Sequence, residues 1–297
     1  MPVSKVQDEG DLTRKQRREQ ARSERKAAEE AAAASDARRR RLTQLGGAVV
    51  VIVVAIVVIL IATGSSSKTS APKFEHKGKG QETVVKAAVN TVEKEIGGIS
   101  QNGNVLGSPT APVTIAYFGD LECPICQEFT VGAEGAEGAL PQLIQKWVRA
   151  GKVKIEYRSL STATAKAEQG AAEPEGTFNR QQSAALAAGK QGKAWYYIEL
   201  FYHLQGKEDS GYVTEKYIQG LAEAVPGLNL STWQSERSNQ AWQAQLSTDA
   251  QEANNNGFTG TPSFLIGKSG SAMKKFEYSS LTDPSSFNEA IEKALKA

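Results

Sequence analysis

The sequence predicts an α/β fold that carries an inserted all-helical domain and is preceded by a single transmembrane helix. An unbroken apolar run near the N-terminus predicts the transmembrane helix. After it, segments typical of strands and helices follow in the order strand, helix, strand, helical block, strand, strand, helix. Strands that alternate with helices in this way are typical of a sheet covered by helices. The length of 297 residues is enough for one or two folded domains.

Residues 1–41 are expected to form a charged cytoplasmic tail. They contain 12 Lys and Arg residues against 8 Asp and Glu residues, whereas the formal net charge of the whole chain is only +2. Without an apolar stripe, such a segment has no face to bury against a core. The basic excess is small, mixed with acidic residues and confined to one end, so we expect no nucleic-acid partner.

A transmembrane helix is predicted over residues 42–64. No charged residue occurs between Arg41 and Lys68. The apolar run of about 17 residues is near the lower limit for crossing a bilayer as a helix. A cleavable signal peptide fits less well, because a long polar tail precedes the run. The arginine block before it favours a cytoplasmic N-terminus, so we expect a single-pass signal anchor in the lipid bilayer of the cell membrane, with the rest of the chain extracytoplasmic.

Residues 65–104 are expected to form a linker followed by a short amphipathic helix. The linker is rich in Ser, Lys and Gly. After it, apolar residues recur at helical spacing at Val85, Val89, Val92 and Ile96. A helix with one apolar face buries that face, so we expect it to pack on the domain formed by residues 105–297.

A central strand is predicted at residues 111–120, where β-branched and aromatic residues predominate. It leads directly to Cys123 and Cys126, the only cysteines of the chain. A helix is expected to begin at or near Cys123, because proline, here Pro124, is favoured in the first turn of a helix. Four residues are expected to interrupt this helix: Gly132, Gly135, Gly138 and Pro141.

The remaining elements follow from the same patterns. They are a helical segment at 141–152, a strand at 152–160, a loop at 161–176, an all-helical block at about 179–256, strands at 261–267 and 274–280, and a closing helix that starts near Asp283 and Pro284. The second of the two late strands is expected at an edge of the sheet. Five aromatic residues in one helix are expected to pack in the core: Trp195, Tyr196, Tyr197, Phe201 and Tyr202.

The two cysteines allow three interpretations: a structural disulfide, part of a metal site, or a redox couple. A zinc site needs about four ligands. The chain has only two histidines, His76 in the linker and His203 in the helical block, so no metal is expected. A bridge across two intervening residues closes too small a loop to stabilise the fold much. A Cys-x-x-Cys at a helix start lowers the pKa of the first thiol, so we predict that Cys123 forms mixed disulfides and that Cys126 resolves them.

A second feature supports redox chemistry. The segment GFTGTPSFLIG places Pro262 immediately before an apolar strand. Proline in a sheet is confined to edges and to the first residue of a strand. An ordinary trans turn is the simplest interpretation of such a proline, and the sequence leaves the isomer open.

Together, the segments APVTIAYFGDLECPICQEF, QGKAWYYIELFY and GFTGTPSFLIG resemble the DsbA-like family of extracytoplasmic thiol–disulfide oxidoreductases, in particular its membrane-anchored Gram-positive and actinobacterial type. The resemblance implies a thioredoxin-like fold for residues 105–297, with the helical block as the inserted domain of the family. It implies that Cys123 and Cys126 form the catalytic redox-active disulfide. Pro262 is then the cis-proline beside it, and Thr261 offers its backbone to a substrate strand.

The resemblance also implies the partners. These are exported proteins with free thiols, as substrates, and a membrane quinone-linked protein that re-oxidises the couple, without a bound cofactor. We therefore expect an enzyme that oxidises exported proteins. The alternatives are a disulfide reductase or isomerase and a non-redox module that binds peptides or acts as a chaperone.

Two departures from the family pattern bear on the redox chemistry. Tyr117 occupies the position where the family usually has a buried acid, and tyrosine is a poor proton carrier near neutral pH. Asp120 and Glu122 lie nearby, either as solvated loop acids or in a catalytic role. Ile125 replaces the histidine of the strongest oxidants, and isoleucine does not stabilise a thiolate. We therefore predict a milder oxidant than the members with Pro-His between the cysteines.

Overall fold

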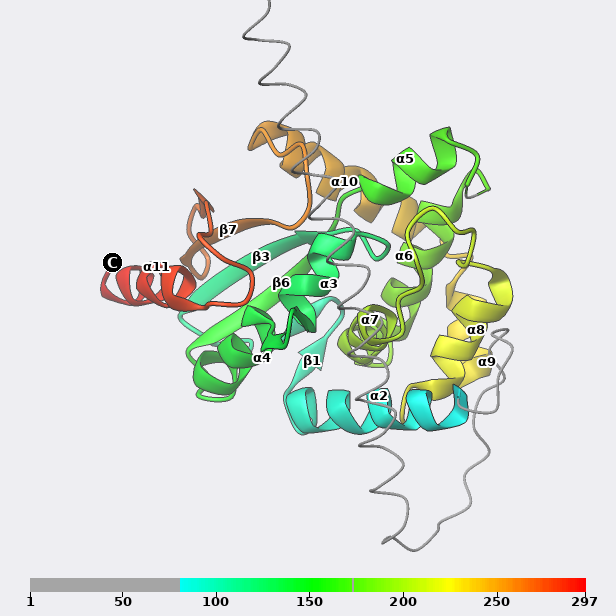
Figure 1. Ribbon diagram of the computed structural model, residues 1–297. Helices are drawn as coiled ribbons and strands as arrows, with labels where there is room; N and C mark the ends of the chain where they lie inside the picture. The colour runs from blue at the N-terminus through cyan, green and yellow to red at the C-terminus, as the bar shows by residue number, and fades with distance from the viewer. Residues whose placement is uncertain (1–80, 173) are drawn as a thin grey trace, which may run out of the picture. The chain divides into compact units, whose positions relative to one another are not determined.

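A mixed β-sheet lies at the centre of the computed structural model, which describes residues 81–172 and 174–297 (Figure 1). Its strands lie side by side in the order β1, β2, β6, β3, β7, β8. Their bounds are β1 Gln101–Asn102, β2 Val105–Leu106, β3 Val113–Gly119, β6 Val153–Ser159, β7 Ser263–Lys268 and β8 Lys274–Phe276. Central strand β3 runs parallel to β6 and antiparallel to β7.

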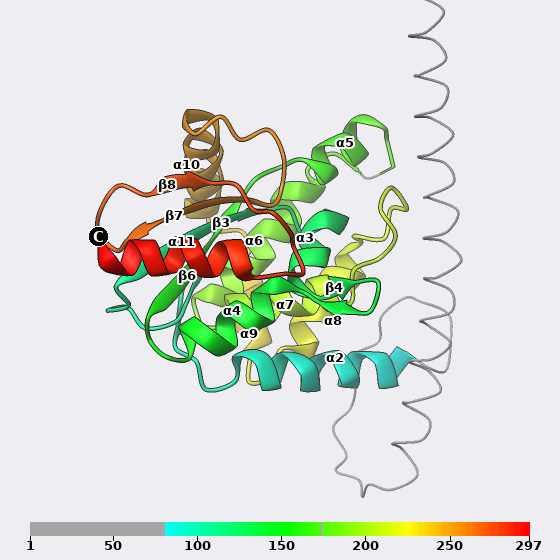
Figure 2. The same cartoon turned by 60° about the vertical axis from the view of Figure 1, so that its left-hand side comes forward.

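Both faces of β3 are covered, because all seven of its residues are buried. On one face, Tyr117 packs with α3 (Pro124–Thr130) and α11 (Ser285–Lys296). On the other face, Phe118 packs with Ala253 of α10 (Ala241–Asn255). Figure 2 shows α11 lying along the sheet, with α10 on the opposite side. A strand covered on both faces has a continuous apolar sequence, as β3 does.

A helical segment separates β6 from β7 in the sequence. It contains α5 Ala163–Gln169, α6 Thr177–Gly189, α7 Ala194–His203, α8 Glu215–Ala224, α9 Leu230–Glu236 and α10. Helix α7 is buried along almost its whole length, and its neighbours include α2 (Gln81–Ile96), α3, α6 and α8 (Figure 1). The expected core packing of its five aromatic residues is confirmed.

Several predicted elements are confirmed. Strands β3, β6 and β7 fall within their predicted segments to within a residue, and β8 is an edge strand. Helix α2 buries Val85, Val92 and Ile96 against the core, as its amphipathic pattern predicts. The closing helix α11 follows Pro284.

Two expectations were wrong. The predicted loop at 161–176 contains helix α5, so the helical segment begins at Ala163. Pro141 does not interrupt a helix; it lies in the first turn of α4 (Ala139–Leu143), where a missing N–H costs no helical hydrogen bond. The glycines before Pro141 do interrupt the helix, because the hairpin of β4 (Gly132–Ala133) and β5 (Ala136–Glu137) lies between α3 and α4. Helix α4 continues as the π-helical turn Ile144–Val148.

The sheet begins before residue 105, because β1 pairs with β2 at Gln101–Asn102. The predicted tail at 1–41, the predicted transmembrane helix at 42–64 and most of the predicted linker lie outside the described residues. Within residues 81–297, no helix is both long enough and apolar enough to cross a membrane.

Candidate active site

Cys123 is the N-cap of α3, at the carboxyl end of the central strand. Its φ of −71° and ψ of 119° are extended, and Pro124 is the first helical residue. A tight turn joins strand to helix, because the Cys123 N–H donates to the Asp120 carbonyl oxygen at 3.0 Å. The predicted start of this helix is confirmed. At this position, the sulfur lies at the positive end of the helix dipole.

The start of β7 brings Thr261 and Pro262 to the same place. The Thr261–Pro262 peptide bond is cis. The Cys123 thiol donates to the Thr261 carbonyl oxygen at 3.4 Å, across 138 residues of sequence. The hydroxyls of Thr261 and Thr162 also form a hydrogen bond, at 2.6 Å. The antiparallel pairing of β3 with β7 therefore places the cis-proline loop against the first cysteine.

The two sulfurs occupy opposite environments. Hydrogen bonding from Cys126 lowers the pKa of Cys123 to about 7 in spite of its burial, and Thr261 and nearby backbone N–H groups act in the same direction. Burial and hydrogen bonding with Cys123 raise the pKa of Cys126 well above its ordinary value. Near neutral pH, Cys123 is a thiolate in a large fraction of molecules and Cys126 remains a thiol. Only the first is suited to attack or to leave as a thiolate.

Three tyrosines lie beside the buried Cys126 thiol: Tyr117, Tyr157 and Tyr202. Tyr117 donates to the Tyr202 hydroxyl at 3.2 Å, and Tyr202 donates to the Asp120 carbonyl oxygen at 3.1 Å. The rings of Tyr117 and Tyr157 meet edge to face at 5.4 Å. Burial first, and then the Cys126 sulfur, raise the pKa of Tyr117 well above its usual range. Tyr117 is therefore a hydrogen-bond donor at neutral pH and not a base.

Gly119 makes room for this cluster. A Cβ atom at this position would lie 2.8 Å from the Tyr157 ring and 3.0 Å from the Tyr202 hydroxyl. Both distances are shorter than ordinary contacts between heavy atoms. A larger residue at the end of β3 would displace the tyrosines that pack beside Cys126.

Asp120 and Glu122 are both buried, so their interpretation as solvated loop acids is wrong. The Asp120 carboxylate accepts hydrogen bonds from the Thr162 N–H at 2.8 Å, the Thr164 N–H at 2.9 Å, the Thr164 hydroxyl and the Glu122 N–H at 3.1 Å. Burial raises the pKa of Asp120, and these hydrogen bonds oppose the rise. The carboxylate fixes the loop before α5 to the cysteine turn. Asp120 is therefore a positioning residue.

Helix α7 holds the cysteine turn from the other side, which the sequence did not predict. Gln205 donates to the Leu121 carbonyl oxygen at 2.6 Å and to the Cys123 carbonyl oxygen at 3.3 Å. Gln127 of α3 donates to the Tyr202 carbonyl oxygen at 2.8 Å. A glutamine just after an apolar helix carries no sequence signal of such a role.

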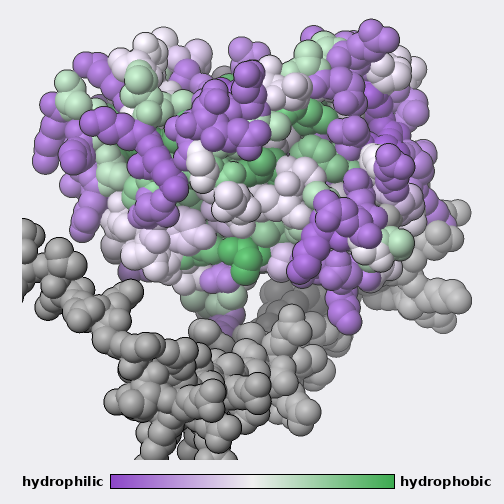
Figure 3. Space-filling view, turned by 90° about the horizontal axis from the view of Figure 1, so that it is seen from above, coloured by the Kyte–Doolittle hydropathy of each residue, from purple (hydrophilic) through white to green (hydrophobic). Residues whose placement is uncertain are grey.

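A hollow of about 450 Å³ adjoins the cis-proline loop. Residues 257–263 and 275–278 line it, so it lies between this loop and edge strand β8. Ile125, beside Cys123, is 44% exposed. The face that carries α5 and α10, at the top of Figure 1, has hydrophobic surface at its centre between hydrophilic margins (Figure 3). An extended peptide is the kind of ligand that fits beside an exposed strand edge.

Known proteins resemble this chain over the same region. A family model described as thioredoxin matches residues 100–293. The probable disulfide bond formation protein D of Bacillus anthracis is 23% identical over 194 residues, which cover 64% of this chain and 77% of that protein. Disulfide bond formation protein D of Bacillus subtilis is 23% identical over 199 residues, which cover 65% of this chain and 77% of that protein.

Solved structures show the same fold. Oxidised BdbD from Bacillus subtilis has a TM-score of 0.51 at 20% identity, over 67% of this chain and 98% of that one. A variant of α-DsbA1 from Wolbachia pipientis has a TM-score of 0.50 at 17% identity, over 65% of this chain and 90% of that one. Residues 100–293, which the family model matches, contain the sheet, the cysteine turn and the helical segment.

Proposed function

Because this chain belongs to the thioredoxin family and is a DsbA-like thiol–disulfide oxidoreductase, we propose that it oxidises exported proteins outside the cell membrane. The reacting group is the Cys123–Pro–Ile–Cys126 couple. The observation that carries the proposal is the contact between the low-pKa Cys123 sulfur and the Thr261 carbonyl oxygen at 3.4 Å. It places the reacting sulfur against the cis-proline loop, which the hollow adjoins.

The proposed reaction proceeds in two exchange steps. In the oxidised protein, a substrate thiolate attacks the Cys123 sulfur and breaks the Cys123–Cys126 bond. The electron pair passes to Cys126, which takes up a proton because its pKa is high. A second substrate thiolate then attacks the substrate sulfur of the mixed disulfide and expels Cys123. A leaving thiol of low pKa departs readily, so this step releases the oxidised substrate.

The substrate would lie along the cis-proline loop. Thr261 offers main-chain hydrogen bonding beside the reacting sulfur, and the adjoining hollow accommodates an extended chain. Main-chain bonding recognises a peptide backbone independently of its side chains. This mode suits an enzyme that acts on many unfolded exported proteins.

The location and the electron acceptor belong to the same proposal. The charge-free apolar run after Arg41 supports a single membrane anchor with a cytoplasmic N-terminus and an extracytoplasmic catalytic region. Two electrons remain on the cysteines after each turnover. A membrane quinone-linked protein would remove them and restore the disulfide.

A reductase or isomerase is the second candidate, and one observation favours it. The pKa of Cys123, lowered to about 7, is closer to that of thioredoxin, a reductant, at roughly 7 than to the value of roughly 3.5 for the strongest oxidants of this fold. The direction of electron flow therefore needs a direct measurement.

The test uses the full chain in detergent, with reduced ribonuclease as substrate. The oxidised wild type is expected to restore ribonuclease activity, and Cys123→Ser to lose this ability. Cys126→Ser, first activated at Cys123 as a mixed disulfide with thionitrobenzoate, is expected to exchange that group for a substrate thiol and to accumulate a mixed disulfide with ribonuclease. The pre-reduced wild type is the control. Unchanged oxidation by Cys123→Ser would refute the proposal, and efficient insulin reduction with little oxidation would favour the reductase. Peptide binding that persists in the double variant, without redox activity, would favour a chaperone.

A further inference from the structure

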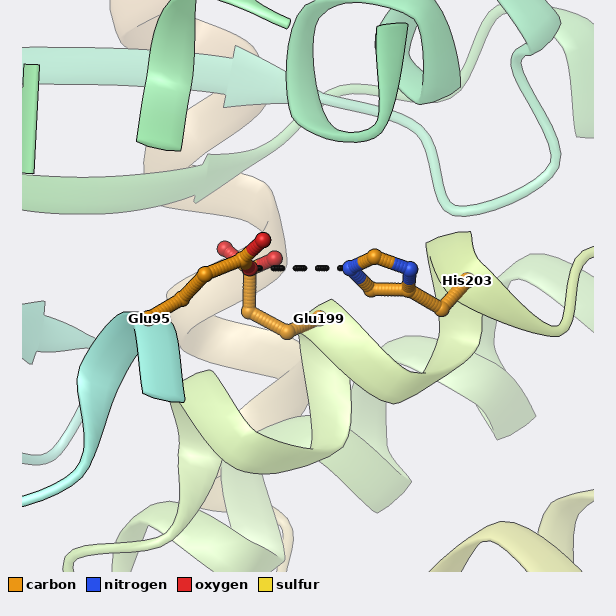
Figure 4. A group of neighbouring side chains, drawn as sticks. All are labelled: Glu95, Glu199 and His203. Carbon is orange, nitrogen blue, oxygen red and sulfur yellow. Dashed lines mark ion pairs between the residues drawn. The ribbon is translucent and has the colours of Figure 1, made fainter. Parts of the chain in front are cut away.

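A group of three potential metal ligands lies where α2 packs against α7. Glu95 comes from the last turn of α2, and Glu199 and His203 lie one turn apart on α7, so all three side chains converge (Figure 4). One ligand atom from each lies within 4.8 Å of the others. His203 Nε2 and Glu95 Oε2 are 3.6 Å apart.

The central carboxylate of this group has no partner. Glu199 is fully buried, and neither of its oxygens accepts a hydrogen bond from any described residue. Glu95 Oε2 and His203 Nε2 are likewise buried atoms without a hydrogen bond in the described part of the chain. A buried carboxylate without a donor or cation is costly. The group lacks a positive charge at its centre.

We propose that Glu95, Glu199 and His203 bind one divalent transition-metal ion, with Zn²⁺ as the preferred ion. An imidazole nitrogen with two carboxylate oxygens suits Zn²⁺, whereas Ca²⁺ and Mg²⁺ prefer oxygen ligands alone. Two donors at ~2.1 Å from a tetrahedral zinc are ~3.4 Å apart, close to the spacing of Glu95 and His203. Two carboxylates would also balance the charge of the ion.

The group lies near the surface, although its ligand atoms are buried. The side chains of Glu95 and His203 are 17% and 12% exposed. Three protein ligands leave a fourth position of a tetrahedral site for water.

The bound ion would act as a cross-link and not as a catalyst. It would join α2 to the end of α7, where Tyr202 directly precedes His203 and Gln205 follows two residues later, after the helix has ended. These two residues hold the cysteine turn through hydrogen bonds to Asp120, Leu121 and Cys123. The inference is independent of the direction of the redox reaction. The opposing interpretation is a metal-free ion pair of His203 with Glu95 beside a neutral Glu199.

Titration calorimetry on the full chain in detergent tests the proposal. The protein carries no histidine tag, and its cysteines are held as the disulfide, so that zinc cannot bind the thiolates. We expect one Zn²⁺ per chain, with Ca²⁺ and Mg²⁺ bound at least ~10-fold more weakly. The thermal midpoint should rise with Zn²⁺, because an ion that binds only the folded state stabilises it.

Substitutions of the three proposed ligands test where the ion binds. Glu199→Gln and His203→Ala should each lower zinc affinity at least ~10-fold, the scale of losses at metal sites. Glu95→Gln, at a partly exposed position, provides a third variant if a buried substitution impairs folding. The matched controls are His76→Ala, at the only other histidine, and Glu82→Gln, at the exposed start of α2. Both should bind zinc like the wild type.

Two results would overturn the proposal. One is a wild type that binds no more zinc than His203→Ala. The other is zinc affinity that all three ligand variants retain, which would place the ion elsewhere. In either case, the metal-free ion pair explains the group.

Discussion

At the scale of single residues, the chemistry depends on the difference between two sulfurs one helical turn apart. Cys123 is 6% exposed and lies among hydrogen-bond donors, whereas Cys126 is fully buried against tyrosine rings. An external thiol reaches the first sulfur and not the second. Burial thus decides which sulfur forms the mixed disulfide.

The reactivity of Cys123 should follow a titration near pH 7. Its folded-state pKa is lowered to about 7, so the thiolate fraction rises as pH rises through this value and falls below it. The rate of alkylation of the reduced protein by iodoacetamide, measured between pH 5 and pH 10, should have its midpoint at about 7. Cys126→Ala removes the main donor and should move the midpoint upward. A midpoint near the ordinary thiol value of about 8.5 in the wild type would contradict this assignment.

Ile125→His should make the couple more oxidising. A histidine cation beside Cys123 stabilises its thiolate and hence the reduced form, and the exposed position of Ile125 leaves room for the ring. One unit of pKa lowering corresponds to ~1.4 kcal/mol, or about 30 mV for a two-electron couple. Equilibrium with glutathione measures the shift, with Ile125→Val as the control. A wild-type reduction potential as high as that of the Pro-His enzymes would contradict the prediction of a mild oxidant.

The role of a single residue could be predicted where the residues next to it in the sequence form a recognisable motif. The cysteine pair and Pro262 stand in recognisable segments, and the structure brings Cys123 to the cis Thr261–Pro262 bond. The roles of Asp120 and Gln205 were not predicted, because each depends on partners more than 40 residues away in sequence. Nothing in the local sequence separates a buried acid from a solvated one.

At the scale of elements, aromatic packing joins the cysteine helix to the sheet. The Phe129 ring of α3 lies 5.2 Å from Tyr117 of β3, 4.9 Å from Phe264 of β7 and 5.5 Å from Phe287 of α11. Helix α3 has only seven residues, too few to be stable alone. The position of α3 therefore depends on the packing of the Phe129 ring.

Phe129→Ala should destabilise the fold by about 3–5 kcal/mol, the usual cost of removing a buried phenyl ring. Urea-induced unfolding followed by fluorescence measures the change. Val84→Ala, at a 53% exposed position of α2, should change the free energy of unfolding by less than ~0.5 kcal/mol. An equal effect of the two substitutions would show that α3 does not depend on the aromatic cluster.

Helices and strands could be predicted where hydrophobic residues recur with the period of a helix or form the apolar run of a buried strand. Strand β3 and helix α2 follow from the residues they bury. Helix α5 does not, because alanine is the only apolar residue type among its seven residues and its start is fixed by hydrogen bonds from Thr162 and Thr164 to Asp120. The two-residue strands β1 and β2 are too short to show any alternation.

At the scale of the whole molecule, the folded region and the predicted membrane anchor occupy different parts of the sequence. Helix α2 starts at Gln81 and buries its apolar face on the sheet domain. The proposed membrane span ends at residue 64. The predicted linker between them is rich in Ser, Lys and Gly.

Deletion of residues 1–64 should release the protein from membranes without loss of activity. The truncated chain keeps α2 and every contact of the cysteine turn described above. Carbonate-washed membranes are expected to retain the full chain, and the truncated form should appear in the soluble fraction and still oxidise reduced ribonuclease. A truncated form that stays with the membrane would contradict the proposed anchor.

The hydroxyl pair of Thr162 and Thr261 has an architectural consequence. These residues are 99 apart in sequence, and their contact closes the base of the helical segment beside Cys123. A chain that leaves and re-enters a core at one point behaves as a long loop, and the entropy of closing a loop grows only with the logarithm of its length. The helical segment is thus inserted beside Cys123 at a modest cost in loop-closure entropy. Within it, Tyr202 and Gln205 must keep their places for the cysteine turn to stay fixed, whereas α8 and α9 carry none of the hydrogen bonds to that turn described above and are freer to vary.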